Sequence, residues 1–222
     1  MTLIWLTILI PLAYLIGSIP FGLIVGLAKG VDPRKAGSGN IGATNVARVL
    51  GKKYFWVVFF LDLLKSLIPV GIASALAHRI PDDQRDWRIY LLWLMVGFAA
   101  VIGHMFSVFL RFKGGKGVAS SAGVMLGLFP YYTWPGLVAI SVFIIVFLPW
   151  RYVSLGSMLG AIAFPIAYLL IALLCGWHPF GSQLPLLVFA VLMAGLIVYK
   201  HRTNIARLRA GTENRFVPKA AA

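Results

Sequence analysis

The sequence is poor in charged residues, in acidic residues and in cysteine. Only 12% of its 222 residues are charged, whereas 60% are hydrophobic, and a soluble domain carries about a quarter charged residues. This shortage excludes an ordinary soluble protein and indicates a membrane protein. The single cysteine, Cys175, excludes an intramolecular disulfide framework and a cysteine-ligated metal cluster, and we expect it to serve packing.

What the chain has instead is a series of apolar runs. Several approach the roughly 20 residues that a helix needs to cross the hydrocarbon core, and alternating strand patterns are absent. We therefore expect an all-α polytopic membrane protein with seven transmembrane helices and short interfacial helices on the cytosolic side. Residues 1–222 should form one domain with a partly flexible tail over 210–222. The spans are predicted at about 3–27, 54–77, 89–110, 118–132, 135–149, 155–174 and 184–199.

Basic residues gather in alternate connections between these spans. Six lie in 29–53, three in 111–117, one at Arg151 and six from Lys200 onward, whereas the remaining connections hold three. Cytoplasmic loops collect Lys and Arg, so we expect the amino terminus outside and the carboxyl terminus in the cytosol. The net charge of +14 fits anionic lipid headgroups better than nucleic acid, and no nucleic-acid partner is predicted.

A polar stretch of twelve residues lies between the first two spans and reads Gly-Ser-Gly-Asn-Ile-Gly-Ala-Thr-Asn-Val-Ala-Arg over 37–48. Its glycines let backbone N–H groups approach a ligand, and Arg48 offers a two-pronged clamp for an anion. Residues 46–50 should continue as a short interfacial helix that starts at the same place. A flexible inter-helix loop is the alternative. The candidate binding residues are Ser38, Gly39, Asn40, Thr44, Asn45 and Arg48.

A second polar cluster opens the fourth span. Gly114, Gly115 and Gly117 surround Lys116, and glycines before a helix start suit phosphate by N–H donation plus a point charge. The cluster is not a Walker A loop, because Leu110 stands where its first glycine would be and Gly117 where its Ser or Thr would bind magnesium. A basic hinge at the membrane surface is the alternative.

The third cluster is the tail that starts at His201. If the last helix continues, His201 and Asn204 share a face and point toward the other loops. Glu213 is the only Glu in the chain. A basic lipid-facing segment is the alternative for this tail. Ser154, at the turn between the fifth and sixth spans, offers a further hydroxyl, although such a Ser is also a common helix cap.

Two charged residues fall near the middle of the second span. Asp62 and Lys65 are three residues apart and therefore lie on one helix face. They are interpreted either as a structural ion pair or as direct contacts of the polar site. His104, inside the third span, is either a packed histidine or a side chain that reaches the site. The four histidines lack metal-binding spacing, and no metal is predicted.

Three anion-binding clusters on one membrane surface favour phosphorylated substrates. An enzyme of lipid metabolism would hold its fatty part among the helices and its soluble part at the cytosolic end. A transporter of a phosphorylated small molecule is the alternative, and it would want polar groups spread toward the midplane, discontinuous helices and commonly internal symmetry. Only Asp62 and Lys65 lie that deep, which favours the enzyme.

Three strings carry a family resemblance: the stretch over 37–48, Gly-His-Met-Phe-Ser-Val-Phe-Leu-Arg-Phe-Lys-Gly-Gly-Lys-Gly-Val-Ala over 103–119, and His-Arg-Thr-Asn-Ile-Ala-Arg-Leu-Arg-Ala-Gly-Thr-Glu-Asn over 201–214. In order and spacing they closely resemble the three motifs of the bacterial acyl-phosphate:glycerol-3-phosphate acyltransferases, the PlsY family. The resemblance implies an inner-membrane enzyme that moves a fatty acyl group from acyl phosphate to the sn-1 hydroxyl of glycerol 3-phosphate. The products would be lysophosphatidic acid and phosphate.

The resemblance also assigns roles at matching positions. Expected catalytic residues are Ser38, Arg48, Lys116, His201 and Asn204, and expected substrate-binding residues are Gly39, Asn40, Thr44, Asn45, Gly114, Gly115, Gly117, Ser154 and Glu213. Acyl phosphate is already activated, so no cofactor, metal or covalent intermediate is expected. The attacking hydroxyl needs a proton acceptor, either His201 or a phosphate oxygen of the substrate. The expected partners are the two substrates and membrane lipid, without an obligate protein partner.

Overall fold

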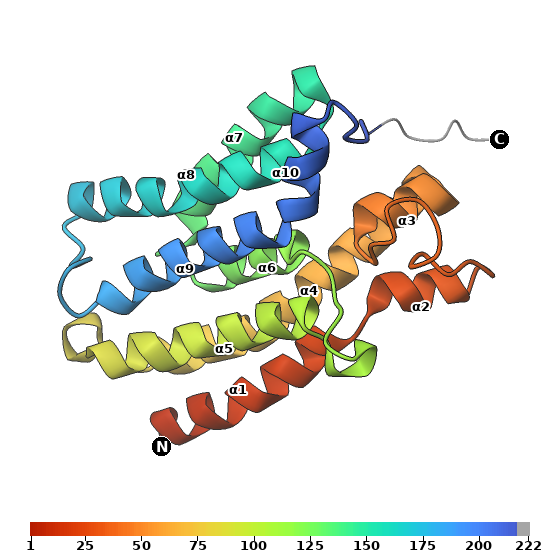
Figure 1. Ribbon diagram of the computed structural model, residues 1–222. Helices are drawn as coiled ribbons and strands as arrows, with labels where there is room; N and C mark the ends of the chain where they lie inside the picture. Colours follow the sequence, from red (N-terminus) through yellow and green to blue (C-terminus); the bar gives the residue numbers. More distant parts are fainter. Residues whose placement is uncertain (217–222) are drawn as a thin grey trace.

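The computed structural model describes residues 1–216, which contain helices and no strand (Figure 1). The α-helices are α1 (Thr2–Ser18), α2 (Phe21–Leu27), α3 (Ala43–Leu50), α4 (Lys52–Ala77), α5 (Trp87–Met105), α6 (Val118–Gly127), α7 (Thr133–Trp150), α8 (Val153–Leu174), α9 (Leu184–Lys200) and α10 (Arg202–Arg209). Short 3₁₀ turns lie at Asp82–Gln84 and Val108–Leu110. The predicted all-α class is confirmed.

Five segments of the described chain are long and apolar enough to cross a membrane, or six if α9 and α10 count as one bent span. The ten residues of α6 extend only about 15 Å at 1.5 Å per residue, half the roughly 30 Å hydrocarbon core. The fourth span was expected over 118–132, but its helix ends at Gly127. The count of seven spans therefore stays a prediction.

Helix α5 lies at the centre of the bundle and α7 at its edge. In the most apolar stretch of Trp87–Leu110, 61% of residues are buried, against 22% for Thr133–Trp150. Helices α1 and α5 approach closely because small residues face each other, as is common between membrane helices. A Cβ added to Gly17 would lie 2.1 Å from the backbone oxygen of Ala100. This close contact holds the carboxyl-terminal part of α5 against the end of α1.

The first span is broken, although the sequence predicted it as one helix over 3–27. Helix α1 ends at Ser18, and Ile19 adopts an extended ψ of 118° before Pro20. The reason is that proline disfavours the helical conformation in the residue before it and supplies no N–H of its own. The carbonyls of Ser18 and Ile19 thereby lose helical donors inside the bundle, and side chains from α4 and the α5–α6 connection satisfy them instead.

The last span is also not continuous, because the chain bends by 55° between α9 and α10, at His201. Cys175, expected to pack inside, is exposed. The amino terminus lies at one end of the bundle, whereas α2, α3 and α10 lie toward the other end (Figure 1). The three polar clusters of the sequence share that second end, where side chains of α3, of the loop before α6, of α8, and of α10 with the tail after it meet.

Candidate active site

The loop before α3 is built around the side chain of Asn45. Its amide nitrogen donates to the backbone oxygens of Pro33, Ala36 and Asn40 at 2.8–3.1 Å, and its oxygen accepts from the N–H of Ser38 at 2.7 Å. The buried Asn45 amide is thus fully engaged within the loop and shapes it from inside. The Ser38 side chain is left exposed on the outer side.

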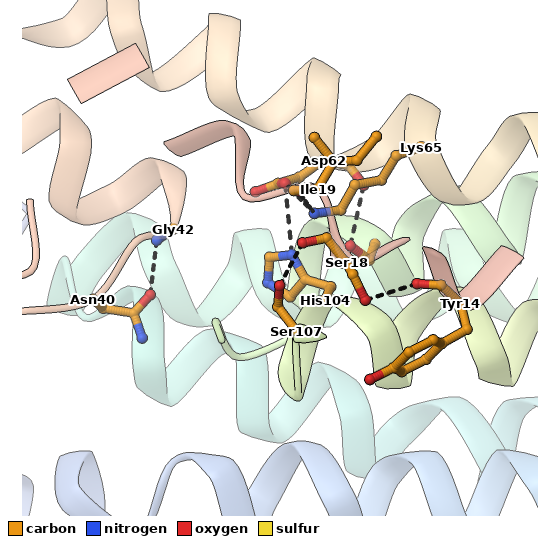
Figure 2. Close-up of polar contacts among 10 residues, drawn as sticks. Tyr14, Ser18, Ile19, Asn40, Gly42, Asp62, Lys65, His104 and Ser107 are labelled. Carbon is orange, nitrogen blue, oxygen red and sulfur yellow. Dashed lines mark hydrogen bonds and ion pairs between the residues drawn. The ribbon is translucent and has the colours of Figure 1, made fainter. Parts of the chain in front are cut away.

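Two features complete this loop. Gly37 and Gly39 adopt φ of 60° and 71°, a left-handed conformation that glycine takes without steric penalty. Asn40 accepts a hydrogen bond from the N–H of Gly42 at 2.8 Å (Figure 2), just before α3 begins. A short helix, expected over 46–50, is present here and starts at Ala43; its interfacial position stays a prediction.

Arg48 reaches from α3 to the carboxyl-terminal tail. Its guanidinium donates to the backbone oxygen of Asn214 at 3.3 Å, and its Nε is buried without a hydrogen-bond partner in residues 1–216. Burial lowers the pKa of Arg48, while the nearby charge of Glu213 opposes that effect. An arginine stays charged near neutral pH despite such a shift, so a cation with spare donors lies here.

The glycine loop holds Lys116 at the start of α6. The N–H groups of Gly114 and Gly115 donate to the backbone oxygens of Met105 and His104 at 3.2 and 3.0 Å. The Lys116 ammonium donates to the side-chain oxygen of Asn204. Burial lowers the pKa of Lys116 to about 8, Glu213 opposes the shift, and neighbouring cations reinforce it.

Glu213 collects three donors at the centre of the site. Its Oε1 accepts from Ser154 Oγ at 2.7 Å and from Asn204 Nδ2 at 2.6 Å, and its Oε2 accepts from Arg207 Nε at 2.7 Å. Burial alone would raise the pKa of Glu213, but these hydrogen bonds outweigh burial and hold the pKa below its usual value. The Ser154 hydroxyl therefore donates to the Glu213 carboxylate and does not cap α8, whose N-cap is Tyr152.

His201 lies at the bend, beyond the last residue of α9. Its Nδ1 is 2.8 Å from the backbone oxygen of Ile197, and a carbonyl acceptor places the proton of the neutral ring on Nδ1. Burial and the positive charge of Lys116 lower the pKa of His201 to about 4. The imidazole is therefore neutral near pH 7, with the lone pair on Nε2.

The structure thus joins residues from all three clusters. Those that meet directly or across one hydrogen bond are Arg48, Lys116, Ser154, Asn204, Glu213 and the tail backbone at Asn214. The hydrogen bonds of Ser38, Asn40 and Asn45 remain inside their own loop. Sequence reasoning missed Arg207. Its position three residues after Asn204, on the same helix face, was the available signal.

Fold and site together define a polytopic helical membrane protein with a polar site at one end of the bundle. Three cations, Arg48, Lys116 and Arg207, influence one another around one carboxylate. The described residues contain no group of three or more His, Cys, Asp or Glu that could hold a metal ion. Such a site suits an anionic, phosphorylated substrate at a membrane surface.

The family model described as glycerol-3-phosphate acyltransferase matches residues 7–211, and the chain belongs to this family. A glycerol-3-phosphate acyltransferase of Geotalea daltonii is 45% identical over 205 residues, 92% of this chain and 94% of the relative. One of Trichlorobacter lovleyi is 46% identical over 204 residues, with the same coverage.

Two solved structures resemble the chain over nearly its whole length. Both are crystal structures of PlsY, described as an integral membrane glycerol 3-phosphate acyltransferase. The glycerol 3-phosphate form is 42% identical with a TM-score of 0.79 and covers 96% of both chains. The lysophosphatidic acid form is 41% identical with a TM-score of 0.76, covering 96% of this chain and 95% of the other. The family resemblance carried by the three motifs is confirmed.

Proposed function

We propose that this protein transfers a fatty acyl group from acyl phosphate to the sn-1 hydroxyl of glycerol 3-phosphate. The hydroxyl oxygen attacks the acyl carbonyl carbon, the bond from that carbon to the phosphate oxygen breaks, and inorganic phosphate leaves. The product is 1-acyl-glycerol 3-phosphate, and the reaction is the first acylation of phospholipid synthesis. Membership of the glycerol-3-phosphate acyltransferase family supports glycerol 3-phosphate as the acyl acceptor. One similar PlsY structure is a glycerol 3-phosphate form and the other a lysophosphatidic acid form, which correspond to the proposed acceptor and product.

The charge balance of the site carries the proposal. Three cations surround Glu213, and that carboxylate already accepts three hydrogen bonds. A second anion is needed to balance the remaining positive charge, and phosphate groups of either substrate supply it. Arg48 and Lys116 then hold the phosphates and stabilise the charge that develops on the carbonyl and leaving group. In this proposal Ser38, Gly39 and Asn40 of the first loop and Thr44 at the start of α3 bind substrate, and Asn45 shapes that loop.

The proton of the attacking hydroxyl goes to a phosphate oxygen of the substrate in this proposal. With its pKa lowered to about 4, His201 is a weaker base than a phosphate monoester, whose second pKa is about 6. His201 then binds and orients the acceptor. His201→Gln should raise the KM for glycerol 3-phosphate and leave the pH profile of kcat unchanged. A profile that loses its acidic limb would make the imidazole the base.

One assay tests the activity against the transporter alternative. The purified protein in lipid vesicles receives palmitoyl phosphate with or without glycerol 3-phosphate, and released phosphate is measured. Release that depends on glycerol 3-phosphate, together with formation of lysophosphatidic acid, is expected. Uptake of labelled glycerol 3-phosphate without acylation would refute the enzyme and support a transporter.

A second experiment tests transfer in one step. Acyl phosphate is activated enough to react directly with a positioned hydroxyl, so the protein should carry no acyl group when it is incubated with radiolabelled acyl phosphate alone. Label that stays on the denatured chain would refute direct transfer. Mass spectrometry of its peptides would then identify the acylated side chain.

The site faces the cytosol of a bacterial inner membrane in this proposal, with the amino terminus outside. Its support is the gathering of Lys and Arg in the connections at the polar end. Cys175 is exposed in the connection at the opposite end, which makes it a natural label. A membrane-impermeant maleimide should modify Cys175 in right-side-out vesicles and leave Cys175→Ser unlabelled. Labelling only after the membrane is opened would reverse the orientation.

A further inference from the structure

A buried charged cluster lies beneath the site, among α1, α4 and α5 (Figure 2). The Lys65 ammonium is 2.7 Å from Asp62 Oδ1 and donates to the backbone oxygen of Ile19 at 2.9 Å. His104 Nδ1 lies 3.5 Å from the same Asp62 oxygen. All three charged or polar side chains are at least 95% buried. The pair is therefore internal, and within residues 1–216 it is linked toward the glycine loop by His104 and toward α6 by Ser120, whose hydroxyl donates to the backbone oxygen of Asp62 at 3.1 Å.

His104 lies directly under the glycine loop. Its backbone oxygen accepts from the N–H of Gly115 at 3.0 Å, and the oxygen of Met105 accepts from Gly114 at 3.2 Å. The imidazole packs against the loop as well, because a Cβ added to Gly115 would lie 2.2 Å from His104 Nε2. One edge of the ring thus faces Asp62 and the other edge faces the residue before Lys116.

We propose that His104 is a positioning residue for the glycine loop, held in place by the Asp62–Lys65 pair. The Asp62 carboxylate lies 3.5 Å from one ring nitrogen, an electrostatic contact without hydrogen-bond geometry, and it favours the ring orientation that turns the other edge toward Gly115. Lys65 in turn holds that carboxylate. The oriented ring supports the backbone of Gly115 and so fixes the position from which the Lys116 side chain reaches Asn204. The inference rests on the proposed function, because its effect is measured through glycerol 3-phosphate.

This arrangement explains why charges are kept in a span. A charge at the centre of a membrane helix is costly to insert, and an apolar pair would pack as well without that cost. An apolar pair could not orient the imidazole. The ring edge that faces Gly115 is therefore the feature to test, separately from the stability of the bundle.

The test is a double-mutant cycle between His104 and the loop glycines. Gly115→Ala should raise the KM for glycerol 3-phosphate at least tenfold, because the new Cβ meets the imidazole. His104→Ala should raise the same KM because the loop loses its support. The KM of the double variant should be at least tenfold lower than the two single effects combined would give, since removing the ring makes room for the methyl group. Throughout, kcat should change less than KM.

Gly114→Ala is the matched control. A Cβ there would lie 2.0 Å from the backbone oxygen of His104, which remains when the side chain is removed. The KM of the double variant Gly114→Ala/His104→Ala should therefore lie within about twofold of the value that the two single effects combined would give, without rescue. Rescue of both glycine variants, or of neither, would overturn the proposal, as would a His104→Ala enzyme with wild-type KM.

A second substitution covers the case in which His104→Ala does not insert. His104→Asn keeps an N–H donor near the position of Nδ1 but lacks the ring edge that faces Gly115, so it should rescue Gly115→Ala in the same way. Failure of the proposed function is distinguishable, because a wild-type protein without acylation of glycerol 3-phosphate would refute that function before any cycle is measured.

Discussion

Loss of the charge on Lys116 should limit the activity of the enzyme at alkaline pH. Burial lowers the pKa of Lys116 from 10.5 to about 8, so the ammonium loses its charge as the pH rises through 8 and the phosphate loses one of its cations. Above pH 7 a phosphate monoester is already a dianion, which leaves Lys116 as the group that changes. From this pKa, kcat/KM for glycerol 3-phosphate should fall to about half its plateau at pH 8 and about a tenth at pH 9.

The fall should appear in kcat/KM and much less in kcat. A bound phosphate dianion favours the charged ammonium and raises its pKa in the complex, so saturating substrate restores the active form. The assay is release of phosphate from palmitoyl phosphate between pH 6.5 and 9.5, with glycerol 3-phosphate varied at each pH. Calorimetric binding of glycerol 3-phosphate at pH 7 and 9 provides a measurement that does not depend on turnover.

Lys116→Arg separates this residue from every other titrating group, because arginine stays charged over the whole range. The variant should lose the alkaline fall, even if its plateau is lower. Lys113→Arg, an exposed position on the same loop, is the matched control and should keep the fall. A wild-type kcat/KM that is flat to pH 9.5, or a fall that persists in Lys116→Arg, would refute the reasoning.

Further predictions concern Glu213, Arg48 and Ser38. Glu213→Gln keeps an oxygen for Ser154 and Asn204 but turns an NH₂ group toward Arg207. It should therefore lower stability by about 1–3 kcal/mol, toward the smaller figure because Arg207 is a third exposed. Glu213→Ala removes all three contacts and should melt at a still lower temperature in detergent; equal melting of the two variants would contradict the proposed hub. Arg48→Ala should lower kcat/KM by about 10- to 150-fold, the equivalent of 1.5–3 kcal/mol for hydrogen bonds to a charged group. Ser38→Ala should also lose activity in a stably inserted protein, and near-wild-type turnover in both variants would mean that the first loop is scaffold.

The sequence predicted the helical class and the meeting of its three motifs at one end. Both depend on local patterns: apolar runs long enough for spans, and Lys and Arg gathered in alternate connections. Contacts of Lys116 with Asn204, and of Arg48 with Asn214, now join segments far apart in the chain. The short helix that carries Arg48 was also predicted, although it begins at Ala43, three residues earlier than expected.

What the sequence could not predict depends on competition between local and tertiary effects. Pro20 breaks the first span, whereas Pro11 and Pro69 remain inside helices. The sequence does not distinguish these prolines, because the side chains that bond the carbonyls freed at the Pro20 break come together only in the folded bundle. The pairing of Glu213 with Ser154 spans 59 residues and has no periodic signal. The internal role of Asn45 was likewise hidden, since an amide that binds a ligand and one that shapes a loop look alike in sequence.

The break at Pro20 also bears on the order in which the protein is made. Ile19 leaves the ribosome first, then Asp62 and Lys65, and His104 last. When α4 enters the membrane, Lys65 already has its carboxylate partner one helical turn away and its carbonyl partner in a segment synthesised earlier. The two partners of the Lys65 ammonium are therefore synthesised before it, and His104 arrives at a charge pair that is already formed.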